Sequence, residues 1–242
     1  MRTRPSSLRQ DAAPCLVISP HLDDAVFSCG MLLASRPGTV VCTVFCGEPT
    51  PPMHTPWDSS AGHRDSSEAM RARIAEDERA LAILDARAIR LPFLDSQYGG
   101  TPSAQEIASG LADVWLHLGT PPLVAPLGLH HSDHVLVGEA CAMLAQRQRM
   151  PALIAYEDAP YRAMRGVSKL RYEMLAARGW RVEQTVRLGD GEPSSPRAGA
   201  ANAKWRAVHA YRSQLRAFAD PHPHDLTEPE RYARLVPRWA RR

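Results

Sequence analysis

Residues 15–46 read CLVISPHLDDAVFSCGMLLASRPGTVVCTVFC, and this stretch decides the fold class. Two runs within it, Cys15 to Ser19 and Val40 to Cys46, have the length and continuous hydrophobicity of strands that are covered on both faces. The segment between them, Asp24 to Ser35, is apolar and long enough for a helix. A strand, a helix and a strand in this order predict a right-handed βαβ unit with parallel strands.

The same alternation continues along the chain. Further buried strands are predicted at Ala88–Pro92, Leu123–Pro126 and Ala152–Glu157. Further helices are predicted at Ser66–Leu84, Ser103–Leu118 and His134–Arg149. The pattern weakens after Tyr161, where we expect an edge strand at Trp180–Leu188, a loop at Gly189–Ala200 and closing helices over 201–219 and 228–241.

These elements predict an α/β fold with a Rossmann-like, mostly parallel sheet and helices on both faces. We expect a single domain over residues 1–242, with a core at about 12–160 and with 161–242 supplying the edge strand and the closing helices. One loop, Gly47–Gly62, holds four prolines and directly follows a strand. Loops in that position surround the ligand crevice of parallel sheets, so this one is a candidate substrate wall as well as a candidate surface loop.

The composition is that of an ordinary globular chain, with 44% hydrophobic and 23% charged residues. A net charge of +3 without a basic cluster argues against a nucleic-acid partner. No apolar stretch approaches the roughly 20 residues of a membrane span, and the first residues lack the apolar run of a signal peptide. We therefore expect a cytoplasmic protein, in which the five cysteines are buried thiols.

The first polar motif is Ser19-Pro20-His21-Leu22-Asp23-Asp24, placed where the first strand ends and a helix begins. A helix N-cap needs one carboxylate, whereas this motif supplies two carboxylates and an imidazole. An imidazole and a carboxylate suit Zn²⁺, and a second carboxylate beside the metal can act as a base.

The second polar motif is His130-His131-Ser132-Asp133-His134, which also follows an apolar strand and precedes an apolar helix. The spacing allows His131 and His134 to face one point at the start of a helix, and it equally allows His130 and His134 to do so. Two such motifs at strand ends can converge at one edge of a sheet, which predicts a metal site there.

These residues resemble a known family. Pro20 to Asp24 match a Pro-His-x-Asp-Asp element, and His131 to His134 match a His-x-Asp-His element, of the PIG-L/LmbE-like zinc-dependent N-deacetylases. Leu22 stands where the family commonly has proline, at a position that supplies no ligand. Further matching residues are Arg73, Glu76, Asp77, Ala80, Leu84, Leu94, Asp95, the run Tyr156–Tyr161, Lys204, Tyr211, Ser213 and Gln214.

The resemblance implies a role for each matched polar residue. His21, Asp24 and His134 would bind Zn²⁺ and leave a position open for water, which is the pattern of a catalytic site. Asp23 would act as the general base toward that water and would return the proton to the departing amine. In the same scheme His131, preferably as imidazolium, would stabilise the oxyanion. Asp133 would hold His131 in the right orientation. The sugar pocket would be lined by Arg73 and Asp95.

The expected reaction is removal of the N-acetyl group from a small-molecule N-acetylglucosamine-type sugar or sugar conjugate, in a biosynthetic pathway. The alternatives are an amidase for a different or larger acyl group and, from another class, a non-catalytic sugar- or nucleotide-binding module. Fe²⁺ could occupy the same ligands as Zn²⁺. The sequence assigns no oligomeric state.

Overall fold

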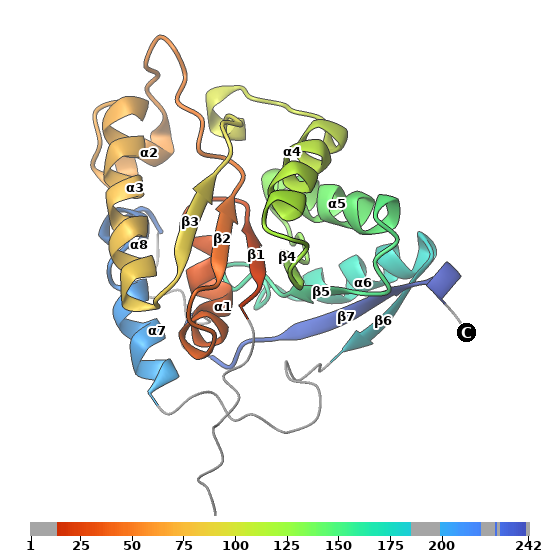
Figure 1. Cartoon of the computed structure of the whole chain (residues 1–242). Coiled ribbons are helices and arrows are strands. Elements are labelled where there is room, and N and C mark those ends of the chain that lie inside the picture. Colours follow the sequence, from red (N-terminus) through yellow and green to blue (C-terminus); the bar gives the residue numbers. More distant parts are fainter. Residues whose placement is uncertain (1–13, 185–198, 219–225, 227, 241–242) are drawn as a thin grey trace, which may run out of the picture.

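The computed structural model describes residues 14–184, 199–218, 226 and 228–240. Its strands form one seven-stranded sheet in the order β3-β2-β1-β4-β5-β7-β6 (Figure 1). The strands are β1 (Leu16–Ser19), β2 (Val40–Thr43), β3 (Arg87–Arg90), β4 (Leu123–Pro126), β5 (Leu153–Tyr156), β6 (Trp180–Gln184) and β7 (Tyr232–Pro237). Strands β3, β2, β1, β4 and β5 are parallel, whereas β7 runs antiparallel to both of its neighbours.

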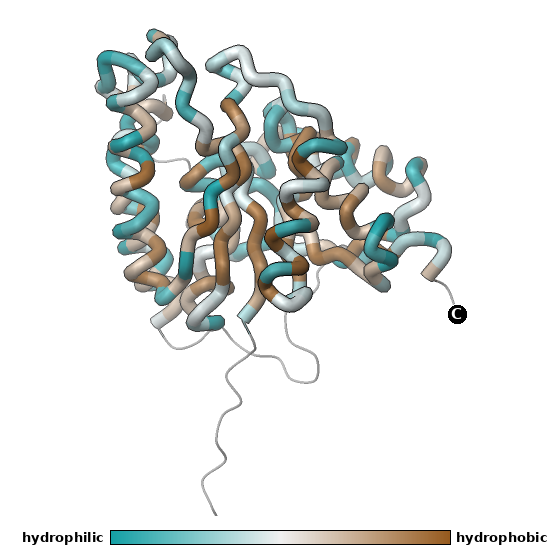
Figure 2. The backbone as a smooth tube through the Cα atoms, turned by 45° about the horizontal axis from the view of Figure 1, so that its top comes forward, coloured by the Kyte–Doolittle hydropathy of each residue, from teal (hydrophilic) through white to brown (hydrophobic). Residues whose placement is uncertain are grey.

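Helices cover both faces of this sheet, and alternate strand residues face each layer. Leu16 and Ile18 pack toward α4, α5 and α6, whereas Val17 packs toward α1, α3 and α7. Figure 2 shows the apolar strands in the middle and more hydrophilic helices outside. The helices are α1 (Asp24–Ser35), α2 (Pro56–Ala61), α3 (Ser66–Ile83), α4 (Ala104–His117), α5 (Ser132–Arg147), α6 (Val167–Ala177), α7 (Ala200–Val208) and α8 (Arg212–Ala217), with short 3₁₀ turns at η1 (Ser96–Tyr98) and η2 (Arg238–Ala240). The predicted fold class is confirmed.

Helix α1 and strand β4 have the predicted bounds, and most other predicted elements of the parallel sheet agree within two residues. Two helices were not predicted. One is α2, inside the proline-rich loop 47–62, where Thr55 caps the helix by accepting from Asp58 N. The other is α6, whose exposed Leu170 and Met174 weaken its helical pattern in the sequence.

The predicted buried strand at 88–92 lies at 87–90 and is only partly buried, because β3 is the edge strand of the sheet. The predicted edge strand after Trp180 is confirmed as β6 up to Gln184. Residues 185–188 and most of the predicted loop, 189–198, lie outside the described residues.

The structure differs from the prediction of two closing helices. The first is divided into α7 and α8 by a turn at residues 209–211, and residue 219 is not described. The second, expected over 228–241, is wrong: this segment contains strand β7. Its residues alternate, with Ala233 and Leu235 buried and with Tyr232 and Arg234 partly exposed, and it fills the space between β5 and β6. Pairing with two strands thus overrides the helical preference of its Ala, Arg and Leu residues.

Within the described ranges, no helix has both the length and the hydrophobicity that a membrane span needs.

Candidate active site

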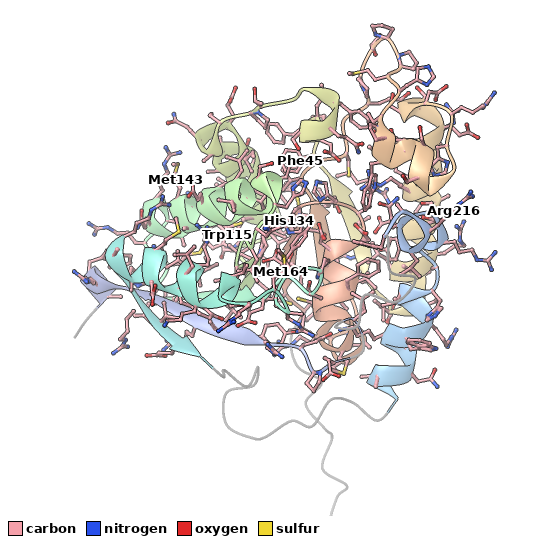
Figure 3. All side chains as sticks on the ribbon, turned by 180° about the vertical axis from the view of Figure 1, so that it is seen from behind. Phe45, Trp115, His134, Met143, Met164 and Arg216 are labelled. Carbon is pink, nitrogen blue, oxygen red and sulfur yellow. The ribbon has the colours of Figure 1, made fainter. Side chains whose placement is uncertain are left out.

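The two polar motifs meet at the carboxyl edge of the sheet. Strand β1 pairs with β4, and the chain leaves them toward opposite sides, to β2 and β3 on one side and to β5 on the other. Ligands of open α/β sheets bind at such a point of divergence. Figure 3 shows His134 and Phe45 near this edge, and the rings of His21 and Phe45 lie 5.6 Å apart.

The first motif forms a tight turn between β1 and α1. Ser19 Oγ donates to the carbonyl of His21 and accepts from Ala25 N at 2.9 Å, which closes the turn. Asp23 occupies the N-cap position of α1 but makes no capping hydrogen bond through its side chain. Helix capping therefore does not explain this carboxylate.

The second motif follows β4 through a turn at Gly128, whose φ is +82°. A Cβ at this position would lie 2.8 Å from the carbonyl oxygen of His134, so only glycine fits. His130, also in the left-handed region with φ 59°, is exposed and packs its ring 5.4 Å from that of Tyr161. Helix α5 then begins at Ser132 and turns the imidazole of His134 into the protein, where it is 1% exposed.

His21, Asp24 and His134 form a triangle of metal donors. Asp24 Oδ2 lies 3.1 Å from His21 Nδ1 and 3.2 Å from His134 Nε2, and the donor atoms of the three residues lie within 4.8 Å of one another. Two donors on one tetrahedral zinc with bonds of about 2.0–2.1 Å are separated by about 3.3 Å. The donor chemistry and spacing therefore fit Zn²⁺, with three protein ligands and a position left for water.

The electrostatics of the triangle also fit a cation. Burial alone would lower the pKa of His134, but the carboxylates of Asp24 and Asp158 raise that pKa to about 9. Burial likewise opposes a charge on His21, and the carboxylates of Asp95, Asp133 and Asp24 raise its pKa well above the usual value. The carboxylates thus draw positive charge into this site, which a bound divalent cation would supply instead of protons.

Each metal-facing imidazole has a carboxylate on its other nitrogen. Asp158 Oδ1 lies 2.7 Å from His134 Nδ1, and its Oδ2 accepts from the backbone N–H groups of Gly128 and Leu129. Asp133 Oδ2 lies 3.1 Å from His21 Nε2. Such partners fix the tautomer and the orientation of metal-binding histidines.

Asp23 is buried beside the donor triangle without belonging to it. Burial, and then the negative charge of Asp24, raise its pKa to about 6, against the opposing effect of Arg73 and His21. A carboxylate with a pKa in this range exchanges protons readily near neutral pH, as a general base must.

A cavity of about 160 Å³ opens onto the triangle and Asp23. It is lined by His21, Asp23, Asp24, Trp57, Arg73, Asp95, Gln97, His131, His134, Pro160, Tyr161, Gln214 and Phe218. A larger cavity of about 810 Å³ lies by α6, β6 and β7, and it contains no residue of the two polar motifs. We assign the chemistry to the smaller cavity because, of the two, only it is lined by the His–Asp–His triangle and by Asp23.

The comparison with known proteins agrees with this geometry. The family described as GlcNAc-PI de-N-acetylase, PIG-L, matches residues 16–145, more than half of the chain. The chain belongs to the PIG-L family. It is thus an N-deacetylase, and its His–Asp–His set is a candidate site for the zinc ion.

Solved structures share the fold of this PIG-L chain over most of its length. A triple mutant of the teicoplanin-pathway deacetylase Orf2 has 24% identity and a TM-score of 0.74, with 93% of this chain and 98% of that chain covered. The zinc-inhibited form of teicoplanin deacetylase Orf2 has 21% identity and the same TM-score and coverage. The A40926 pseudoaglycone deacetylase Dbv21 has 23% identity and a TM-score of 0.71, with 95% and 99% covered. No curated protein sequence matches the chain significantly.

The PIG-L resemblance assigns His131 to oxyanion stabilisation and Asp133 to its orientation. The structure places the half-buried His131 in the cavity, with its Nδ1 accepting from Asp133 N at 3.2 Å. Burial, and then the charges of His21 and His134, lower the pKa of His131. These contacts favour a neutral ring with its proton on Nε2 rather than the expected imidazolium. The Asp133 carboxylate contacts His21 and Ser96 N.

Arg73 and Asp95 lie together in the cavity. Arg73 is only 3% exposed, which excludes the solvated helix charge that its sequence position also allowed. Its Nη1 lies 3.8 Å from Asp95 Oδ2, and Nε and Nη1 have no hydrogen-bond partner among the described residues. Asp95 also accepts from Gln97 N, as a turn-forming residue does.

Sequence reasoning assigned no role to several residues of this site. Asp158 and Tyr161 lie in the run Tyr156–Tyr161, which matched the family without an assigned function, and Gln214 was matched in the same way. Trp57 lies in the loop that was considered as a substrate wall, and it does line the cavity. Phe218 had no signal in the sequence.

Proposed function

We propose that this PIG-L enzyme hydrolyses the N-acetyl group of a 2-acetamido sugar or sugar conjugate, with Asp23 as general base and acid. One observation carries the proposal: a buried carboxylate with a pKa raised to about 6 stands beside a complete His–Asp–His donor set and is not part of it. A binding module that had lost its activity would need neither the base nor an open metal position.

The residues of the site have different roles in the proposed reaction. Zinc held by His21, Asp24 and His134 would lower the pKa of a bound water and polarise the amide carbonyl. Asp23 takes a proton from the attacking water and delivers it to the amide nitrogen, so that the amine leaves neutral. The C–N bond breaks and a C–O bond forms from the water oxygen, which gives acetic acid and the free amine; the acid then passes its proton to the amine, so that the products are acetate and the ammonium form of the amino sugar.

In this proposal His131 donates from Nε2 to the oxygen that gains negative charge during attack. Its Nδ1 is held as an acceptor by Asp133 N, which leaves the proton on the other nitrogen. Preorganised donors of this kind stabilise the transition state more than the ground state. Arg73, which is buried and has two nitrogens without a hydrogen-bond partner among the described residues, is proposed to hold the sugar hydroxyls together with Asp95.

The test measures acetate release and metal content together. We expect release from N-acetylglucosamine conjugates to stop on chelation and to return on adding Zn²⁺. Loading with Fe²⁺ is the second arm, because the same ligands accept both metals. Release of a longer acid but not of acetate would replace the proposal with an amidase for larger acyl groups, and the lack of any hydrolysis in the metal-loaded protein would refute it. The cytoplasmic location expected from the sequence stays a prediction.

A further inference from the structure

Helix α2 brings a tryptophan to the mouth of the active site, and its position is fixed by contacts to the segment that carries Asp95. Thr55, which caps α2, donates from Oγ1 to Gln97 Oε1 at 2.8 Å. Gln97 in turn donates to Asp95 Oδ2 at 3.0 Å. Tyr98 OH donates to the buried Asp58 of α2 at 2.9 Å. The wall that carries Trp57 is thus built onto the sugar-binding side of the cavity.

The indole of Trp57 is held in one orientation. Its Nε1 donates to Gln214 Oε1 at 3.2 Å, and its ring meets Phe218 edge-to-face with centroids 5.5 Å apart and an interplanar angle of 84°. Both rings are partly exposed and line the cavity. Neither ring can bind a metal or move a proton in the reaction, so the proposed chemistry leaves both without a role.

The polar groups of this wall already form hydrogen bonds within the protein. The indole N–H is bonded to Gln214, which is 1% exposed and whose Nε2 donates to Ser213 Oγ at 3.1 Å. Sugar hydroxyls need free hydrogen-bonding groups, and Arg73, whose Nε and Nη1 have no hydrogen-bond partner among the described residues, supplies donors elsewhere in the cavity. The wall offers a ligand the apolar surface of two aromatic rings, against which a further aromatic ring can pack edge-to-face or offset-stacked.

The size of the cavity shows where such a group would lie. At about 160 Å³, the cavity is smaller than the roughly 300–1,000 Å³ of pockets that enclose a whole drug-sized ligand. It therefore has room for the acetamido group and the sugar carbons next to it, while the rest of a glycoside must extend past the mouth.

We infer that Trp57 and Phe218 form a binding subsite for an aromatic aglycone, so that the preferred substrate is an aryl glycoside of a 2-acetamido sugar. The inference rests on the proposed deacetylase function and adds the substrate class. The proposed aglycone contact is the same in the ground state and in the transition state, so we expect it to act on KM more than on kcat.

The experiment compares the phenyl and methyl β-glycosides of N-acetylglucosamine as substrates of the zinc-loaded full chain. We expect the wild-type KM for the phenyl glycoside to be about tenfold lower, as contact with one further aromatic ring allows. Trp57→Ala should bring the ratio of the two KM values close to one, and Trp57→Phe should keep most of the preference. Trp205→Ala removes an exposed tryptophan of α7 outside the cavity and should leave the ratio unchanged.

A second measurement is independent of turnover and of how well a variant catalyses. Calorimetric titration with the phenyl and methyl glycosides of glucosamine, the amine products, should show the same preference in the wild type and its loss in Trp57→Ala. Equal binding of the two glycosides by the wild type, or a preference that survives in Trp57→Ala, would overturn the inference while deacetylation stands. A preference for longer acyl groups instead of aryl aglycones would overturn it as well. If the loaded wild type released acetate from neither glycoside, the proposed function itself would fail.

Discussion

Replacing Asp158 with asparagine tests what its carboxylate contributes to zinc binding through His134, because the substitution keeps the packing around that ring. Asp158 is fully buried just after β5, where one oxygen meets His134 Nδ1 and the other accepts two backbone N–H groups. Asparagine has the same shape, and its amide oxygen can still accept from Gly128 and Leu129. Its amide nitrogen, however, then points hydrogens at His134 Nδ1. The ring is pushed toward the tautomer with its proton on Nε2, which is the metal-facing atom.

The expected loss of zinc affinity follows from these contacts. Loss of a carboxylate partner behind a metal-bound histidine typically weakens metal binding 10–100-fold. The 2.7 Å contact is short and fully buried, so we expect the upper end of this range, a rise in the zinc Kd of about 100-fold, or about 2.8 kcal/mol. The metal-free protein loses one charge-assisted hydrogen bond but leaves no backbone N–H unpaired, which costs about 1–2 kcal/mol of its free energy of unfolding.

Zinc affinity is measured by competition with a chromophoric chelator, and stability by urea unfolding of the metal-free chain. Asp113→Asn, at an exposed position of α4, is the matched control for the change of charge and should leave both quantities unchanged. If Asp158→Asn bound zinc within about twofold of the wild type, this carboxylate would not set the tautomer of His134, and our account of the metal site would be wrong.

Three further predictions address the roles of the motif residues. Asp23→Asn is expected to retain zinc and to lose roughly 100-fold or more in kcat, since general acid–base catalysis contributes about 10²–10⁴-fold; a fully active variant would remove Asp23 as the base. The pKa of Asp23 is raised to about 6 in the metal-free protein, and a bound cation lowers it, so kcat/KM should fall as the pH drops through a value at or below about 6. An acid limb that persisted unchanged in Asp23→Asn would contradict that assignment. Finally, His134→Ala should abolish zinc binding and His130→Ala should barely change it, because the ring of His130 is exposed; the reverse result in zinc titrations would exchange their roles.

The sequence alone was enough to predict the parallel strands of the sheet and the convergence of the two polar motifs. Strands such as β1 and β4 are buried on both faces, so their apolar runs are continuous and easily recognised. Each of the two polar motifs follows one of these strands, and the carboxyl ends of parallel strands lie at one edge of a sheet. The convergence of His21 with His134 follows from that rule once β1 and β4 are neighbours, as they are here.

What the sequence did not reveal depends on contacts between distant segments. Strand β7 has helix-compatible residues, and only the open edges of β5 and β6 make it a strand. Asp158 is a single carboxylate in a loop, and nothing around it in the sequence shows that His134 lies 2.7 Å away. Phe218 reaches the cavity only because α8 packs beside α2, a contact between segments more than 150 residues apart along the chain.

The place of β7 between β5 and β6 has a consequence for how the chain is made. Strand β6 has no direct partner in β5, so when it leaves the ribosome it has nothing to pair with until residues 232–237 follow. Until then β5 presents an unpaired edge, the kind of surface through which nascent chains aggregate. The loop after β5, which holds Asp158, is tied to the same late segment, because Glu157 N donates to the carbonyl of Arg231. The loop behind His134 therefore gains this contact only after residues 231–237 have been made, and a chain that stopped before β7 would carry both polar motifs without it.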